Sequence, residues 1–268
     1  MRDQATQEER DAGRGYEALF VPALFKPWTR HLIEAAAVRA GDRVLDVACG
    51  TGVLARHALL LAGGHGHVTG LDPAPGMLAA AAEAEPRIDW VQGTAEALPF
   101  DADTFDCVIS QFGMMFFEDR DRAAAQMCRV TRPGGQVAVA VWNAISSNPA
   151  YGDMIAVLEE QVGAAAAEAL RLPYSLGDAA GVAECLERAG FGGVAWETRQ
   201  EQARFPQTRT MVEAELRGWL PLFGIHLDEA KIAEVLARSD RRLAQYTTAS
   251  GTAEFATSAH ILWAQKPG

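Results

Sequence analysis

The segment that most constrains the fold is Val44–Gly52, which reads VLDVACGTG. The apolar run from Arg43 to Ala48 predicts a buried parallel strand, and a helical pattern starts at Val53, directly after two glycines. Glycine lets the backbone approach a ligand where a Cβ would intrude, and the free N–H groups at the start of a helix can face that ligand. The segment therefore predicts a ligand site at the carboxyl end of a strand.

A second apolar run, Val68–Leu71, ends in Asp72, whose carboxylate could accept hydrogen bonds from two ribose hydroxyls. The pattern Gly50-x-Gly52-x-x-Ala55 with Asp72 also fits the loose dinucleotide fingerprint, so a nicotinamide-dependent oxidoreductase stays open. Asp46, inside the first strand, is not explained by a plain turn, because a charged residue is rarely buried without partners. We expect Asp46 to orient the N–H groups of the loop or to meet a cationic amino group.

Five motifs carry a resemblance to a known family. VLDVACGTG and GLDPAPGML (70–78) resemble the first two motifs of class I S-adenosylmethionine-dependent methyltransferases. VQGTAEALPF (91–100), FDCVISQ (105–111) and RVTRPGG (129–135) follow in the order that this family shows. The resemblance is strongest to the small-molecule branch that includes the ubiquinone/menaquinone-biosynthesis type methyltransferases.

Strand and helix patterns alternate along the first half of the chain. We expect strands near 43–48, 67–71, 88–92, 105–110 and 136–142, separated by helices near 53–62, 75–84 and 121–130. With later strands at 194–205 and 255–265, this predicts an α/β, Rossmann-like, doubly wound sheet of seven mostly parallel strands. We expect a poorly ordered tail over residues 1–15 and a single methyltransferase domain over 16–268. Helical insertions over about 145–177 and 206–250 are expected to form a cap, by analogy with the fold.

The resemblance implies that S-adenosylmethionine is the cofactor and S-adenosylhomocysteine the product. Thr94 stands where relatives of this branch usually carry the Asp that contacts the adenine amine, so Thr94 and Glu96 both stay open for that contact. Core packing is the alternative role for Tyr16 and Trp28. The candidate cofactor-binding residues are Tyr16, Trp28, Asp46, Ala48, Gly50, Gly52, Asp72, Pro73, Met77, Thr94, Ala95, Glu96 and Gln111.

The segment Gln111–Phe117, QFGMMFF, follows the fourth expected strand, and its aromatic and thioether side chains suit an apolar acceptor. Methyl transfer is an in-line displacement in which positioning is a large part of catalysis, so a catalytic triad is not required, and none is visible. Gln111 is a candidate for positioning, and core packing is the alternative for the other residues of this segment. His226 is a candidate base, for which a solvated or capping histidine is the alternative. The candidate substrate-binding residues are Phe112, Met114, Met115, Phe116, Trp142, Trp219, Phe223 and His226.

Charge and composition argue against several classes of protein. The net charge is −11 and no basic run occurs, so we expect no nucleic-acid partner. The four cysteines form no C-x-x-C pair, and His65 and His67 lack a third ligand nearby, so we expect neither a disulfide framework nor a metal site. The polar start of the chain and the absence of a long apolar run predict a cytoplasmic protein without a membrane span.

These patterns together predict methyl transfer from S-adenosylmethionine to oxygen, nitrogen or carbon of a small, mostly apolar metabolite. Two alternatives come from other classes: an NAD(P)-dependent oxidoreductase, and a non-catalytic protein that only binds S-adenosylmethionine. The oligomeric state stays open, with a homodimer among the options.

Overall fold

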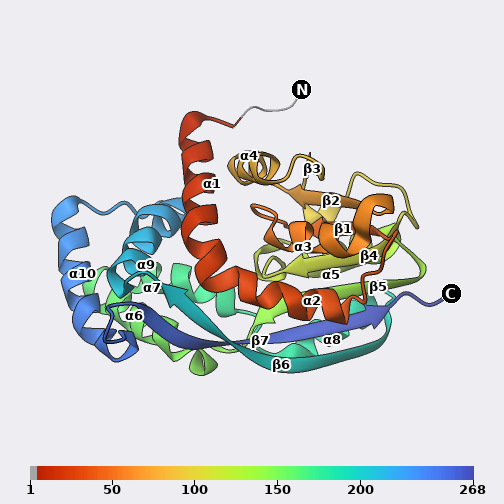
Figure 1. The fold of residues 1–268 in the computed structure, drawn as a ribbon. Helices are drawn as coiled ribbons and strands as arrows, with labels where there is room; N and C mark the ends of the chain where they lie inside the picture. The colour runs from red at the N-terminus through yellow and green to blue at the C-terminus, as the bar shows by residue number, and fades with distance from the viewer. Residues whose placement is uncertain (1–4) are drawn as a thin grey trace.

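A computed structural model describes residues 5–268 of the chain (Figure 1). A seven-stranded sheet runs through it in the order β3-β2-β1-β4-β5-β7-β6. The first five strands are parallel to one another, and β7 is antiparallel to both of its neighbours. The predicted doubly wound, mostly parallel sheet is confirmed. The strands are β1 Arg43–Val47, β2 His67–Asp72, β3 Asp89–Gln92, β4 Phe105–Gln111, β5 Thr131–Trp142, β6 Gly192–Phe205 and β7 Ala253–Gln265.

The core of the molecule lies on the central strands. Leu45 of β1, Ile109 of β4 and Val139 of β5 have no exposed surface. Most residues of these strands are apolar and buried because helices cover both faces of a parallel sheet. β6, at the edge, alternates between exposed and partly buried positions instead. The burial pattern of each strand is therefore the one expected for its position, either in the centre or at the edge of the sheet.

Helices pack on the sheet, most of them on its parallel strands and α8 (Ala179–Arg188) on β6 and β7. α2 (Thr29–Ala35) packs with α3 (Val53–Ala62), and α5 (Arg120–Val130) packs with α8. α4 (Pro75–Ala84) lies against β2 and β3. None of the helices within residues 5–268 is both long enough and apolar enough to cross a membrane.

The N-terminal helix α1, Gln7–Phe20, begins at a capping box formed by Thr6 and Glu9. It lies along α4 (Figure 1), and the two helices meet so closely that a Cβ on Gly13 would be 2.4 Å from the carbonyl oxygen of Gly76. Our expectation of a poorly ordered tail over residues 1–15 is therefore wrong for residues 7–15. Residues 1–4 lie outside the described part of the chain.

The chain between α1 and α2 changes its helical period twice. Val21–Phe25 form a π-helical turn, η1, and Lys26–Trp28 form a 3-10 turn, η2. Pro22 and Pro27 stand in these turns, where the missing N–H of proline and its ring interfere with a regular α-helix. The two prolines thus mark the point where α1 gives way to α2.

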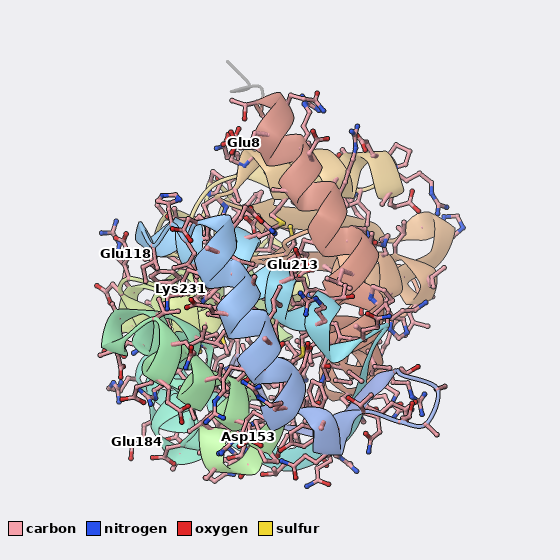
Figure 2. All side chains as sticks on the ribbon, turned by 90° about the vertical axis from the view of Figure 1, so that its left-hand side faces the viewer. Glu8, Glu118, Asp153, Glu184, Glu213 and Lys231 are labelled. Atoms are coloured by element: carbon pink, nitrogen blue, oxygen red, sulfur yellow. The ribbon has the colours of Figure 1, made fainter. Side chains whose placement is uncertain are left out.

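The two segments expected as insertions are helical and pack together into one layer, which we call the cap (residues 145–177 and 206–250). Asp153 of α6 accepts hydrogen bonds from Arg242 at 2.8 Å and Tyr246 at 2.9 Å, where α6 meets the end of α10 (Figure 2). The cap contains α6 Pro149–Gln161, α7 Ala164–Arg171, η7 Leu172–Tyr174, α9 Thr208–Ala214, η8 Glu215–Trp219, η9 Leu220–Phe223, α10 Glu229–Arg242 and η10 Ala244–Tyr246.

The strand expected near 136–142 begins earlier, because β5 starts at Thr131. Pro133-Gly134-Gly135 lies inside β5, where the register against β4 shifts between Phe105 and Cys107. Gly134 has a φ of +74°, a conformation that glycine adopts without a Cβ clash. The PGG segment is therefore an irregular start of β5, not a loop that precedes it.

Candidate functional site

β1 continues into residues 48–52, which we call the glycine loop. Ala48, Gly50 and Gly52 have φ values of +57°, +55° and +83°. The N–H of Cys49 donates to the carbonyl of Leu71 on β2 at 3.0 Å, and the N–H of Gly52 donates to the carbonyl of Cys49 at 2.8 Å. Positive φ at a residue with a Cβ, such as Ala48, is strained and tends to occur at functional sites. The loop is thus a tight, strained turn at the carboxyl ends of two neighbouring strands.

The two glycines of the loop have different surroundings. A Cβ on Gly50 would meet no atom within 4 Å, so this position faces open space. A Cβ on Gly52 would lie 2.2 Å from the indole of Trp90. We expected Gly52 to make room for a ligand, but the structure fills that side of Gly52 with a core-packed ring. Gly50 is the glycine at which a ligand can approach the backbone.

Asp72, the last residue of β2, holds the glycine loop. Its Oδ2 accepts from the N–H of Gly50 at 2.9 Å, and its Oδ1 accepts from the N–H of Ala74 at 2.9 Å. Burial raises the pKa of this carboxyl, and the two backbone hydrogen bonds partly oppose that effect. Each carboxylate oxygen can accept a second hydrogen bond, so the predicted contact with ribose hydroxyls is compatible with this geometry.

Asp46 on β1 is 1% exposed. Its Oδ2 accepts from the N–H of Ala55 in the first turn of α3 at 3.0 Å, and its Oδ1 has no hydrogen-bond partner among residues 5–268. Burial raises the pKa of this carboxyl well above its usual range. Asp46 therefore fixes the start of the helix that follows the loop, and one of its oxygens is left for another group.

Several more buried polar atoms without a partner in residues 5–268 belong to the same region. Native proteins leave few such atoms, so their concentration around one loop indicates a ligand that can donate hydrogen bonds or carries positive charge. Two of them lie at the end of β4, one in the glycine loop and one on α1. These atoms are Ser110 Oγ, Gln111 Oε1, Thr51 Oγ1 and Glu17 Oε2, the last on a carboxylate whose Oε1 pairs with Arg56 at 2.6 Å.

The residues predicted to surround adenine follow β2 and β3. Pro73 and Thr94 are exposed, Met77 is partly buried, and Ala95 is buried. Glu96 points elsewhere, because its Oε1 accepts from the N–H of Glu118 at 2.9 Å. Of the two candidates for the adenine amine, Thr94 therefore has the free side chain.

The two aromatic candidates from the N-terminal segment separate in the structure. Trp28 has no exposed surface, and its ring stands edge-on to Phe112 and Trp142 at centroid distances of 5.8 and 5.6 Å. Trp28 therefore packs in the core, and its Nε1 has no hydrogen-bond partner among residues 5–268, so its contact with the cofactor stays a prediction. Tyr16 stacks on Phe25 at 5.4 Å, and burial together with the carboxylate of Asp72 raises the pKa of its phenol. Tyr16 therefore reaches the glycine-loop region from α1.

The segment after β4 is mostly core as well. Met114 and Met115 are 2% and 1% exposed, and the ring of Phe112 stacks on Trp142 at 3.8 Å. The expectation that these methionines line the acceptor pocket is wrong for this packing, because their side chains are covered on all sides. Gln111 is different: its Nε2 donates to the carbonyl of Phe25 at 3.1 Å, while its Oε1 is unpaired within the described residues.

The remaining acceptor candidates lie at the cap surface. Phe116, Trp219 and Phe223 form a row with centroid distances of 5.6 and 5.2 Å, and Phe116 and Phe223 are more than 40% exposed. His226 is exposed between η9 and α10 and makes no hydrogen bond with residues 5–268. The structure thus gives no support to His226 as a base inside the buried site.

The sequence reasoning missed three polar residues of the cap. Glu215 is 7% exposed, and its Oε1 accepts from the hydroxyl of Tyr151 at 3.4 Å. Burial raises the pKa of Glu215 to about 8, and burial also raises the pKa of Tyr151 and Tyr174. The available signal was spacing, because Glu215 falls midway between Met211 and Trp219 at intervals of four residues. A carboxylate on the apolar face of a helix is unusual enough to single out.

Glu215 should make the stability of the protein depend on pH. Its pKa is about 8 in the folded chain against an ordinary value of 4.5, so between these values only the folded chain keeps the proton. The free energy of unfolding should therefore fall as pH rises through this window, by up to about 1.4 kcal/mol per pH unit. We expect urea denaturation to show that the free energy of unfolding falls less between pH 5 and pH 8 in Glu215→Gln than in the wild type.

The matched control for this comparison is Glu213→Gln. Glu213 is exposed and pairs with Arg217 at 2.9 Å, so its removal should leave the difference between pH 5 and pH 8 unchanged. The buried carboxyls of Asp46 and Asp72 titrate in the same direction, but they are present in all three proteins. Equal pH dependence in the wild type and Glu215→Gln would contradict a proton held by Glu215.

Comparison with known proteins agrees with this geometry. Residues 44–135 match the family model described as a methyltransferase domain. The ubiquinone/menaquinone biosynthesis C-methyltransferase of Marinomonas sp. (strain MWYL1) is 41% identical over 118 residues, which are 42% of this chain and 47% of that protein. The chain thus matches about half the length of such curated relatives.

Two solved structures share the fold. Phosphoethanolamine N-methyltransferase 2 of Haemonchus contortus, in complex with S-adenosyl-L-methionine, has a TM-score of 0.60 at 18% identity, over 98% of this chain and 58% of that chain. The [4+2]-cyclase SpnF has a TM-score of 0.53 at 21% identity, over 91% and 81% of the two chains. At these identities the likeness concerns the fold alone, and one fold can host different reactions.

Proposed function

We propose that this chain, whose residues 44–135 form a methyltransferase domain of the class I S-adenosylmethionine-dependent type, transfers a methyl group from S-adenosylmethionine to a small acceptor. The observation that carries the proposal is the group of unpaired buried polar atoms around the glycine loop, of which all but Glu17 Oε2 belong to the matched residues 44–135. The cofactor bears an ammonium group, a sulfonium and two ribose hydroxyls, so it offers the donors and the positive charge that this region lacks.

The residues present fit the cofactor in three places. The open side of Gly50 would take the methionine part, with Asp46 Oδ1 and Gln111 Oε1 available for its ammonium group. Asp72 would accept from the ribose hydroxyls while it holds Gly50. Thr94, with Pro73, Met77 and Ala95 nearby in the fold, would lie along the adenine.

The bound cofactor supplies an electrophilic methyl group on sulfur. The task of this chain is to align an acceptor with that methyl and to keep water away. α1 carries Tyr16, whose ring stacks on Phe25 in the turn that follows α1. Closure of α1 and the cap over the strand ends would exclude water from the reacting groups.

The acceptor in this proposal is a small, mostly apolar metabolite. Phe116, Trp219 and Phe223 form a partly exposed aromatic row that would receive it, and Trp142 lies deeper in the same region. The net charge of −11 supports a small molecule over a nucleic acid as the substrate, and a cytoplasmic location is part of the same proposal.

Calorimetry with the purified chain tests the cofactor. We expect S-adenosylhomocysteine to bind with a Kd below about 100 μM and NADH and NADPH to give no binding heat, in keeping with ordinary enzyme–ligand affinities. Binding of a nicotinamide cofactor without binding of S-adenosylhomocysteine would replace the proposal with the oxidoreductase alternative. Formation of S-adenosylhomocysteine from S-adenosylmethionine in the presence of an acceptor separates an enzyme from a protein that only binds the cofactor.

A further inference from the structure

Glu215 is a buried carboxylate that lacks a positive partner. It belongs to η8, a π-helical turn, and π-helical turns occur often at functional sites. Its hydrogen bond with Tyr151 is long, at 3.4 Å, and no arginine, lysine or histidine among residues 5–268 forms an ion pair with it. Arg217, two residues further on, is exposed and pairs with Glu213 and Glu229 instead. Buried carboxylates are normally paired, and without a positive partner Glu215 keeps its proton at neutral pH, so a bound cation would be needed for it to ionise.

Aromatic rings surround the carboxylate. Tyr151 lies 5.8 Å from Tyr174 between ring centroids, and Tyr174 lies 6.3 Å from Trp142. Tyr16 joins the same cluster through Phe25, because Tyr16 stacks on Phe25 at 5.4 Å and Phe25 lies 6.3 Å from Trp142 between ring centroids. Besides burial, the charge of Glu215 raises the pKa of Tyr16, Tyr151 and Tyr174. These phenols, from α1, α6 and η7, are the titratable groups that face Glu215, and none of them carries a positive charge.

This cluster adjoins the proposed cofactor site. Trp142 ends β5 and stacks on Phe112, which follows β4, so the rings lie over the carboxyl ends of the central strands. Tyr16 stacks on Phe25, and the carbonyl of Phe25 accepts from Gln111 at the end of β4 at 3.1 Å. A molecule bound between these rings would therefore stand next to whatever occupies the glycine loop.

We propose that Glu215, Tyr16, Tyr151, Tyr174 and Trp142 form an amine subsite that binds the acceptor as an ammonium ion. This inference rests on the proposed function and adds to it the chemical class of the acceptor, an amine with an apolar body. The carboxylate supplies the missing counter-charge, and the ring faces attract the same cation. A neutral hydroxyl acceptor would leave the buried carboxylate without a counter-charge.

The subsite also provides for the proton that an ammonium ion must lose before its nitrogen can attack a methyl group. The N–H bond breaks, an O–H bond forms on the carboxylate of Glu215, and the nitrogen keeps the electron pair. A neutral amine and a neutral carboxylic acid result, so charge and atoms balance. The pKa of about 8 at Glu215 applies without a ligand, and an ammonium ion beside the carboxyl would lower it, so the bound amine itself produces the ionised form that can accept the proton.

A series of three ligands of equal shape tests the subsite by calorimetry in the presence of S-adenosylhomocysteine: benzylamine, benzyl alcohol and benzoate. We expect benzylamine to bind the wild type at least tenfold more tightly than benzyl alcohol, and benzoate to give no binding heat. Glu215→Gln should reduce the preference for the amine to less than twofold and leave the Kd of S-adenosylhomocysteine unchanged.

Glu213→Gln is the matched control, because Glu213 is exposed, lies two residues before Glu215 and is seen between α1 and α10 in Figure 2. It should keep the tenfold preference. Equal binding of benzylamine and benzyl alcohol to the wild type, no binding of benzylamine, or a preserved preference in Glu215→Gln would each overturn the inference. The wild-type series decides the matter even if Glu215→Gln does not fold. Failure of S-adenosylhomocysteine to bind would instead contradict the proposed function itself.

Discussion

Replacement of Gly50 by valine should abolish binding of the cofactor while the chain still folds. Gly50 has a φ of +55° and its Cβ direction is open, so valine meets no protein atom but projects into the space proposed for the methionine part of the cofactor. We expect the Kd of S-adenosylhomocysteine to rise at least 100-fold, which corresponds to about 2.7 kcal/mol. The positive φ should cost about 1–3 kcal/mol of stability. Calorimetry and urea denaturation measure the two effects.

The variant Gly224→Val is a control that separates the stability cost of valine at a positive φ from the loss of space for the cofactor. Gly224 has a φ of +72° and also faces open space, but it caps η9 in the cap. Its variant should lose similar stability and keep the wild-type Kd for S-adenosylhomocysteine. A Gly50→Val protein that binds the cofactor normally would show that the open side of Gly50 is not part of the cofactor site.

Asp72→Ala should weaken the cofactor by at least 30-fold, or about 2 kcal/mol. Its carboxylate holds the N–H groups of Gly50 and Ala74, each at 2.9 Å, and we propose that it also accepts from the ribose hydroxyls. Hydrogen bonds to a charged group contribute about 1.5–3 kcal/mol each, so the loss of one ribose contact would already produce an effect of this size. Titration with S-adenosylhomocysteine gives the Kd directly.

Asp89→Ala is the control for this change. Asp89 begins β3, is exposed, and pairs with His67 at 2.9 Å, so its removal should not alter the Kd. Circular dichroism should show that Asp72→Ala is folded. An unchanged Kd in a folded Asp72→Ala protein would show that this carboxylate does not contact the cofactor. Its role would then be structural, namely to hold the glycine loop next to β2.

The strands and the glycine loop could be predicted from the sequence because their signals are local. The apolar run before the loop has the composition of a strand that is covered by helices on both faces. β1 occupies Arg43–Val47, within the expected range. The helix of residues 53–62 and the strand that ends in Asp72 follow for the same reason. The spacing of apolar residues and the positions of glycines are properties of residues that are adjacent in the chain, so they can be read directly from the sequence.

The tertiary structure alone decided which side chains face the site. The same aromatic and thioether composition after β4 fits a pocket or a core, and only the packing of the cap and of Trp142 buries Met114 and Met115. Glu96 and Thr94 are equal candidates in the sequence until the N–H of Glu118 takes the carboxylate of Glu96.

Contacts between residues that are distant in the sequence decided the remaining features of the fold and the site. β7 inserts between β5 and β6, although it follows both in the chain, and Trp90 takes the space beside Gly52 from a neighbouring strand. Tyr151 and Glu215 meet across 64 residues of sequence. Sequence motifs and the spacing of apolar residues thus predicted the sheet, the glycine loop and the cofactor class, because each of these predictions depends on residues that are adjacent in the chain. The buried carboxylate and its aromatic surroundings came only from the fold, because burial and contact are properties of residues that are distant in the chain.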